Sequence, residues 1–352
     1  MDYKKEIQDL VDLIIKEDAS DLHLSEGRTP IIRVSGGLIP LVNKPVLSSS
    51  DMNGFVGIFL SPEGRQILAR DKAADFSYSL VQTRFRGNVY YRQGSLSIAL
   101  RLIPRVIRTL SELNLPPLLE TFTRKRQGFF LVVGPVGQGK TTTLATLIEI
   151  INQTRAEHIL TIEDPIEYQF ESKRSIIDQR EVRIDTPDFS DALVSMFRED
   201  IDVCMVGEMR DKETIGTAVT AAETGHLIFS TLHTNDAAQT INRIIDSFPS
   251  DQQDQIRVQL AASMTGIFSQ RLIQRISGGL IPAYELLINN NAVGNLIREK
   301  RIHEIDTVIE TSAQEGMIDF NRSLAELVRA GEITVESAYL NSHNPKTLEK
   351  MI

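Results

Sequence analysis

The sequence contains a single cysteine, Cys204, and no tryptophan in its 352 residues. One cysteine excludes a disulfide framework and a four-cysteine zinc site within the chain, so we expect no zinc. No apolar run approaches the roughly 18 residues that span a bilayer, and the charged stretch 1–18 lacks the continuous apolar core of a signal peptide. These absences predict a cytoplasmic protein whose membrane contacts are peripheral.

Positive charge is also in short supply. The chain has 38 basic and 47 acidic residues and a net charge of -9. A strongly anionic chain is a poor candidate for binding nucleic acid through bulk charge, although local basic patches stay open. Without tryptophan it also lacks an aromatic run on which bases would stack. We therefore expect no nucleic acid among its partners.

The length predicts two domains, of which the first covers residues 1–104. A helix is expected at 4–16, because five apolar residues share one face: Ile7, Leu10, Val11, Ile14 and Ile15. Short strand-like runs follow at 21–24, 31–34, 38–41, 75–80, 84–91 and 95–103. This region reads as an α+β domain. Prolines and basic residues predict a linker at 105–127.

The pattern of apolar and polar residues changes after residue 127. Short apolar runs alternate with helical stretches over residues 128–290, at 128–133, 158–163, 202–207 and 227–232. Buried strands that alternate with helices predict an α/β core with a largely parallel sheet. Residues 291–352 are expected to be helical, with helices at 292–301, 303–313, 320–330 and 334–340.

The first apolar run of this core leads into a phosphate-binding motif. Residues Gly134, Pro135, Val136, Gly137, Gln138, Gly139, Lys140 and Thr141 fit GxxxxGK[ST], and Thr142 continues into the helix. The glycines let backbone amides curve around phosphate oxygens, Lys140 reaches the β- and γ-phosphates, and the Thr141 hydroxyl ligates Mg²⁺. The motif predicts a P-loop ATPase that uses ATP and Mg²⁺. The alternative is a glycine-rich turn that matches by chance.

Two acids end apolar strands where a nucleotide is expected. Glu163 ends the run 158–163, and Glu208 follows the run 202–207. Ligands of a parallel sheet lie at the carboxyl ends of its strands, so both acids are candidates for a metal ligand or a water-positioning base. The alternative for each is a solvated loop acid.

Two histidines and several arginines leave alternatives open. His226 and His233 flank the run 227–232. His233 ends that run and can sense the γ-phosphate, whereas His226 reads equally well as a structural histidine. A metal pair lacks the expected ligand set. The first domain carries Arg84, Arg86, Arg92 and Arg101. They are solvated charges on strands, or one of them completes the nucleotide site of a neighbouring subunit. Their spacing in the sequence does not show which arginine would do so.

Four segments resemble the secretion and pilus ATPases of the type II/type IV superfamily. Residues 19–41 are similar to that family's PAS-like N-terminal domain, 159–168 to its Asp box, 196–211 to its Walker B region and 221–237 to its His box. The resemblance implies a RecA-like P-loop ATPase core and a homohexamer. It makes Glu163 the catalytic glutamate and Glu208 the Walker B acid near Mg²⁺. It makes His226 and His233 the His-box residues, and Arg86 and Arg101 arginines donated to the adjacent site.

Within this family the chain looks most like the ATPases that retract type IV pili and drive twitching motility. Its extension and secretion relatives carry extra N-terminal domains and often a four-cysteine zinc element. Residues 291–305 and 344–352 resemble C-terminal segments of the retraction subfamily. The resemblance implies work at the cytoplasmic face of the inner membrane on a platform protein of the pilus machinery. The alternative is pilus extension or type II secretion. Val136, Gln138 and Gly294 depart from the usual threonine, serine and arginine.

Overall fold

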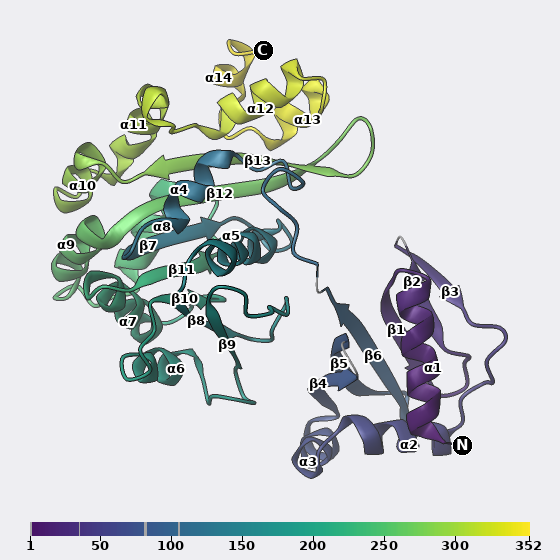
Figure 1. Cartoon of the computed structure of the whole chain (residues 1–352). Helices are drawn as coiled ribbons and strands as arrows, with labels where there is room; N and C mark the ends of the chain where they lie inside the picture. The colour runs from purple at the N-terminus through teal and green to yellow at the C-terminus, as the bar shows by residue number, and fades with distance from the viewer. Residues whose placement is uncertain (1, 35, 81–82, 105) are drawn as a thin grey trace. The chain divides into compact units, whose positions relative to one another are not determined.

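The computed structural model of the chain describes residues 2–34, 36–80, 83–104 and 106–352. Met1, Ser35 and Arg105, which belong to the expected first domain and linker, lie outside the described residues. The chain forms two compact units (Figure 1). The first comprises residues 1–105 with 167–169, and the second comprises 106–166 with 170–352.

Over its described residues, the first unit is an antiparallel sheet in the order β3-β2-β1-β6-β5-β4 with three helices. Its elements are α1 (Tyr3–Lys16), β1 (Ala19–Ser25), β2 (Ile31–Val34), β3 (Gly37–Pro40), α2 (Ser49–Phe59), α3 (Pro62–Asp71), β4 (Ala73–Leu80), β5 (Thr83–Arg92) and β6 (Ser95–Ile103). All six expected strands are present with small shifts at their ends. Helices α2 and α3 are additional, and a capping box between Ser48 and Asp51 starts α2.

The apolar stripe of α1 explains the packing of this unit. Ile7, Leu10 and Ile14 are buried, and they pack into one core with apolar residues of α2 and of the sheet. Asp2 caps the helix by accepting from the Lys5 amide at 3.3 Å. The periodic pattern therefore predicts the helix and most of the face that it buries, but Ile15, which was expected on that face, is 52% exposed.

The second unit is built on a seven-stranded sheet in the order β13-β12-β7-β11-β10-β8-β9. Its strands are β7 (Gly128–Val133), β8 (His158–Glu163), β9 (Ile176–Glu181), β10 (Val203–Val206), β11 (Leu227–Leu232), β12 (Met264–Gln274) and β13 (Leu280–Ile288). All neighbouring strands are parallel except β12 and β13, which form an antiparallel pair. This is the expected α/β core, and β9, β12 and β13 extend it beyond the expected strands.

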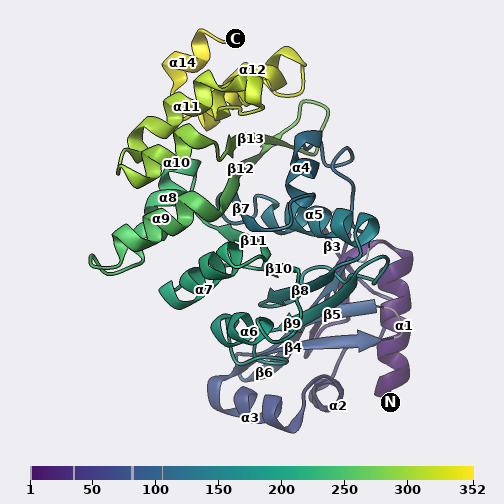
Figure 2. The same cartoon turned by 60° about the vertical axis from the view of Figure 1, so that its left-hand side comes forward.

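Helices cover both faces of this sheet (Figures 1 and 2). The helices before residue 291 are η1 (Pro117–Leu119), α4 (Glu120–Thr123), α5 (Lys140–Thr154), α6 (Phe189–Met196), α7 (Lys212–Glu223), α8 (Ala237–Asp246) and α9 (Gln253–Ser263). Strand β7 shows the double burial. Phe130 and Val132 pack in one core with α5, and Phe129, Leu131 and Val133 pack in the other with α7, α8 and α9. A strand buried on both faces has a continuous apolar sequence, which explains the run GFFLVV.

The chain after β13 is largely helical. It forms α10 (Asn291–Arg298), η2 (Ile302–Glu304), α11 (Ile305–Thr311), η3 (Ala313–Glu315), α12 (Phe320–Arg329), α13 (Val335–Asn341) and α14 (Pro345–Glu349). Phe320, Leu324 and Leu348 pack against Ile273 and Ile281, so the last helices rest on the β12–β13 hairpin. Among the described residues, no helix combines the length and the hydropathy needed to cross a membrane.

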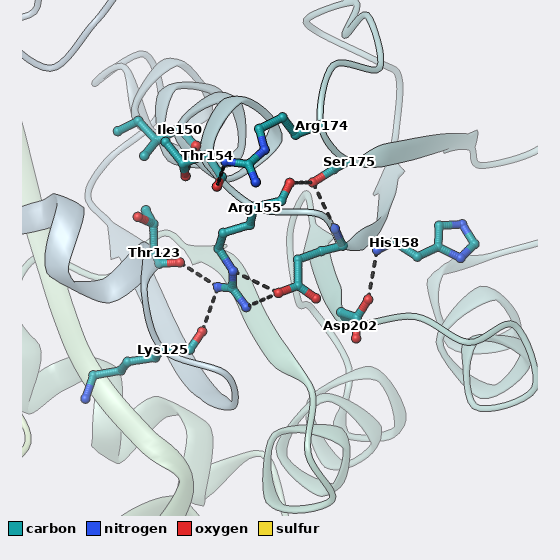
Figure 3. Close-up of polar contacts among 10 residues, drawn as sticks. Thr123, Lys125, Ile150, Thr154, Arg155, His158, Arg174, Ser175 and Asp202 are labelled. Carbon is teal, nitrogen blue, oxygen red and sulfur yellow. Dashed lines mark hydrogen bonds and ion pairs between the residues drawn. The ribbon is translucent and has the colours of Figure 1, made fainter.

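Polar contacts anchor the C-terminal end of α5 (Figure 3). The Arg155 guanidinium donates to the Thr123 carbonyl at 2.6 Å and the Lys125 carbonyl at 2.8 Å, and it also pairs with Glu157. Ser175 donates to the Arg155 carbonyl at 2.8 Å. These bonds tie the end of α5 to the segment before β7 and to the start of β9. Helix α5 is therefore fixed at the end opposite the phosphate-binding loop.

Candidate functional site

The strand order brings four loops to one edge of the sheet. Strands β7, β11, β10 and β8 are neighbours, and their paired residues include Val133 with Leu232 and Val206 with Ile162. Because these strands are parallel, their carboxyl ends meet at the same edge, where ligands of such sheets bind. The phosphate loop, Glu163, Glu208 and His233 follow or end these four strands.

The phosphate loop lies between β7 and α5 and needs its glycines. Gly134, Gly137 and Gly139 have φ angles of 144°, 78° and 78°, which residues with a side chain rarely adopt. A Cβ atom on Gly134 would also collide with the Gln270 carbonyl of β12. By contrast, Val136 is 81% exposed at the loop's outer side. The departure of Val136 from the family's usual threonine therefore changes the surface of the loop rather than its path.

Lys140, the first residue of α5, is buried under the loop. Its ammonium donates to the carbonyls of Gly134 at 2.7 Å and Pro135 at 2.8 Å. Burial lowers the pKa of Lys140 to about 8, although the Glu208 carboxylate opposes this effect. An anionic phosphate at the loop would supply the counter-charge that favours the protonated lysine.

His233 links Lys140 to Glu208. Its Nδ1 lies 3.2 Å from the Lys140 ammonium and its Nε2 lies 3.4 Å from the Glu208 carboxylate. An ammonium only donates hydrogen bonds, so Nδ1 accepts and the ring carries its proton on Nε2, facing Glu208. Arg210 pairs with the other oxygen of Glu208 at 2.5 Å. A chain of alternating donors and acceptors therefore runs from the phosphate loop across β11 to β10.

Glu163 ends β8 and is held by its neighbours. It is 3% exposed, and its Oε1 accepts from the Thr161 hydroxyl at 2.7 Å and the Gln179 amide at 3.2 Å. Thr161 lies two residues earlier on the same strand, hence on the same face. A buried carboxylate oriented by two donors suits the positioning of an attacking water better than a solvated loop acid does.

The donor set at this edge fits a magnesium ion. Thr141 begins α5 after Lys140, and its hydroxyl makes no hydrogen bond within the part of the chain that the structure describes. Glu208 contributes carboxylate oxygens from the loop after β10. Mg²⁺ is usually held by one or two protein oxygens together with substrate phosphates and water, so these two residues would hold it.

His226 lies elsewhere. It precedes β11, so the whole strand, about 20 Å long, separates it from His233. Its Nδ1 lies 3.1 Å from the Ala221 carbonyl, and its ring packs edge-on against Phe197. The two histidines therefore lie at opposite ends of β11.

Arg86 and Arg101 lie on the first unit, on neighbouring strands. They face each other directly across the β5–β6 pair, hence on one face of the sheet. Arg101 donates to the Asp21 carboxylate at 2.8 Å while its side chain stays 69% exposed. Burial raises the pKa of Asp21, but hydrogen bonds from Ser20 and Arg101 outweigh it and lower the pKa overall. Arg86 also lies 3.5 Å from the Glu167 carboxylate, so each arginine of the pair has a carboxylate partner within the chain.

Some contacts escape sequence reasoning. Gln179 lies on β9 and Gln270 on β12, two strands that the apolar pattern did not reveal. The position of Arg86 directly opposite Arg101 on neighbouring strands could have been predicted from the sequence of the turn between them. The two-residue turn Gln93-Gly94, with φ angles of 50° and 80°, joins β5 to β6 and determines their register.

The fold and this site define a nucleotide-hydrolysing α/β protein. The family model described as "Type II/IV secretion system protein" matches residues 70–329, and the chain belongs to this family. A twitching motility protein of Neisseria gonorrhoeae is 43% identical over 91% of this chain and 86% of its own length. The type IV pilus retraction ATPase PilT of Pseudomonas aeruginosa is 41% identical over 95% of this chain and 97% of its own.

A solved structure agrees with this assignment. The crystal structure of the pilus retraction motor PilT with bound ADP superposes with a TM-score of 0.91 and is 44% identical in sequence. The match covers 97% of this chain and 98% of that one. The expected family, fold class and enzyme class, a P-loop ATPase of the secretion and pilus family, are thereby confirmed.

Proposed function

We propose that this chain is an ATP-hydrolysing motor that powers type IV pilus retraction and works as a homohexamer. The carrying observation is the convergence of Lys140, Glu163, Glu208 and His233 at the carboxyl ends of neighbouring parallel strands. The relatives described as twitching motility protein and retraction ATPase PilT support the same activity, because the match spans nearly the whole chain.

In the proposed mechanism, the backbone N–H groups of residues 136–142 and the Lys140 ammonium bind the phosphates of ATP. Thr141 and Glu208 would hold Mg²⁺, which would supply positive charge next to the phosphates. Glu163, oriented by Thr161 and Gln179, polarises the attacking water. A bound γ-phosphate competes with His233 for the Lys140 ammonium. The contact of His233 with Glu208 therefore depends on whether the γ-phosphate is present.

The arginine pair completes the proposed site from a neighbouring subunit. Arg86 and Arg101 of one subunit stabilise the charge that develops on the phosphates bound by the next, as an arginine finger does. The proposal is supported by the position of these two exposed arginines directly opposite each other on one face of the sheet. His226, which lies far from its own chain's phosphate loop, would join the site only through such an interface.

The proposal divides the chain into a PAS-like domain at 1–104, a linker at 105–127, a RecA-like core at 128–290 and a C-terminal helical region at 291–352. Hydrolysis changes the subunit interfaces around the ring. The ring acts at the cytoplasmic face of the inner membrane, where it turns a platform protein of the pilus machinery. The same cycle in the other direction would serve extension or secretion.

ATP hydrolysis by the purified protein, measured against its concentration, tests the motor. We expect activity to rise steeply with assembly and to collapse in Glu163→Gln, Lys140→Ala and Arg101→Ala. An equal mixture of Lys140→Ala and Arg101→Ala should recover up to about a quarter of wild-type activity. That is the share of interfaces that combine an intact lysine with an intact neighbouring arginine. Activity that survives Arg101→Ala at every concentration would refute the composite site.

Expression in a piliated strain that lacks its retraction ATPase tests the direction. The strain carries excess pili, and restored twitching with fewer pili supports retraction. A chain that instead restores pili to a strain without its extension ATPase is an extension motor. Lys140→Ala is the matched control in both strains, because it removes the phosphate-binding cation.

A further inference from the structure

A buried glutamine on β12 contacts the phosphate loop. Gln270 is 2% exposed, and it follows Ser269, the last β12 residue that pairs with β7. Its side-chain Nε2 donates to the Gln138 carbonyl at 2.5 Å, and its Oε1 accepts from the Thr143 hydroxyl at 2.7 Å. Its backbone carbonyl is the group that leaves no room for a Cβ on Gly134. Gln270 therefore lies against Gly134 at the start of the phosphate loop and bonds to Gln138 near its end.

The orientation of this amide follows from its partners. The Gln138 carbonyl can only accept a hydrogen bond, so the amide nitrogen of Gln270 must face it. The amide oxygen then faces Thr143, whose hydroxyl can donate. Both ends of the side chain are satisfied in this orientation alone, so the amide is held in one of its two possible orientations.

The bond to the Gln138 carbonyl has a consequence for the next amide. The peptide between Gln138 and Gly139 is trans and planar, because the cis peptide among the described residues is the one between Asp164 and Pro165. In a trans peptide the carbonyl and the N–H point in opposite directions. When Gln270 holds the carbonyl towards β12, the N–H of Gly139 points away from β12. Amides of this loop are the groups that bind phosphate oxygens.

Gln138 adds a second contact with the same strand. Its side-chain Oε1 accepts from the Leu272 amide of β12 at 2.7 Å. The serine usual at this position is too short to make such a contact over the same distance. In this chain, the main chain of residue 138 is held by Gln270 and its side chain by Leu272, so two bonds brace the loop against one strand.

From these contacts we propose that Gln270, assisted by Gln138, is a positioning residue that orients the Gly139 amide for the phosphates of the nucleotide. The inference rests on the proposed ATPase function and concerns the same site. Neither side chain needs to touch the nucleotide. Their effect is on binding, because an amide already aimed at the phosphate loses less freedom when the ligand arrives.

The variant Gln270→Glu tests the main brace. It keeps an oxygen for Thr143 but replaces the donor to the Gln138 carbonyl by a second oxygen. Gln138→Met is an uncharged variant that removes the acceptor for the Leu272 amide. Gln253→Glu is the matched control, because the Gln253 amide also donates to a backbone carbonyl, that of Phe248 at 3.1 Å, but away from the loop. Binding of ADP with Mg²⁺ is measured by titration calorimetry, together with KM, kcat and the melting temperature of each variant.

We expect ADP to bind about tenfold more weakly to Gln270→Glu and about threefold more weakly to Gln138→Met, and as in wild type to Gln253→Glu. KM for ATP should rise in parallel while kcat changes less, because the Gly139 amide binds substrate and transition state alike. A lower melting temperature with unchanged ADP affinity in both loop variants would overturn the inference. If Gln270→Glu does not fold, Gln138→Met decides alone. A wild-type chain that binds no ADP would instead refute the proposed function.

Discussion

The bond from Thr161 to the buried carboxylate of Glu163 allows a sharp prediction. The change Thr161→Val keeps the shape of a side chain that is 0% exposed and removes the hydroxyl that donates to Glu163 at 2.7 Å. A hydrogen bond to a charged group contributes about 1.5–3 kcal/mol. Gln179 keeps its own bond to the same oxygen, so we expect the lower end of this range.

About 1.5 kcal/mol lost from the orientation of Glu163 corresponds to a roughly tenfold fall in kcat. KM for ATP should not change, because within the described residues the Thr161 hydroxyl bonds to Glu163 and not to the phosphate loop. The melting temperature should move by no more than about 2–4 °C, since a buried valine replaces a buried threonine. Steady-state ATP hydrolysis at saturating ATP, with ADP binding measured separately, gives all three quantities.

Two controls make this prediction refutable. Thr265→Val removes a comparable threonine hydroxyl, bonded to the Phe129 carbonyl at 3.2 Å near the start of β12, and should leave kcat unchanged. On the background Glu163→Gln, the change Thr161→Val should have little further effect on kcat, because both act through one group. An unchanged kcat in Thr161→Val, or a full tenfold loss on the Glu163→Gln background, would show that Thr161 does not act by orienting the carboxylate.

Two further predictions concern Lys140 and Gly294. Since burial lowers the pKa of Lys140 to about 8, the protonated form that binds phosphate is lost as the pH rises. We therefore expect kcat/KM for ATP to fall about tenfold for each pH unit above this pKa. The variant Lys140→Arg, whose side chain stays charged, should show no such decrease. A flat wild-type profile from about pH 7 to 9 would contradict this. Gly294 lies inside α10, where an added Cβ would meet Ala261 and Arg298 at an ordinary 3.5 Å. Gly294→Ala should thus stabilise the fold by about 0.5–1 kcal/mol, seen as a melting temperature higher by about 1–3 °C, and a lower one would show that α9 needs the space.

The buried parallel strands were predictable from the sequence because each is covered on both faces. Strands β7, β8, β10 and β11 read as apolar runs bounded by polar residues, and their carboxyl ends located the loop, Glu163, Glu208 and His233 together. Strand β9, with the sequence IIDQRE, escaped because it lies at the sheet edge and mixes polar with apolar residues. Helix α2 escaped because two glycines and polar residues obscure its period.

The contacts that orient the site residues were not predictable in the same way. Gln270 reaches the phosphate loop because β12 pairs with β7, a partner more than 100 residues earlier in the chain. Local propensity carries no information about such a pairing. The resemblance to a family supplied roles for Arg86 and Arg101, but their direct opposition across one hairpin comes from the register of β5 and β6.

Hydrogen bonds along α5 join this helix to the segment that precedes β7. Thr146, in the middle of α5, donates to the Arg108 carbonyl at 2.8 Å, and Arg155 holds the carbonyls of Thr123 and Lys125. The stretch from 106 to 127 is thus pinned along the helix whose other end carries Lys140. Any movement of α5 when phosphate arrives or leaves is passed to both pinned points of that stretch. A displacement of α5 would therefore also displace Arg108 and residues 123–125, because these hydrogen bonds join their carbonyls to the helix.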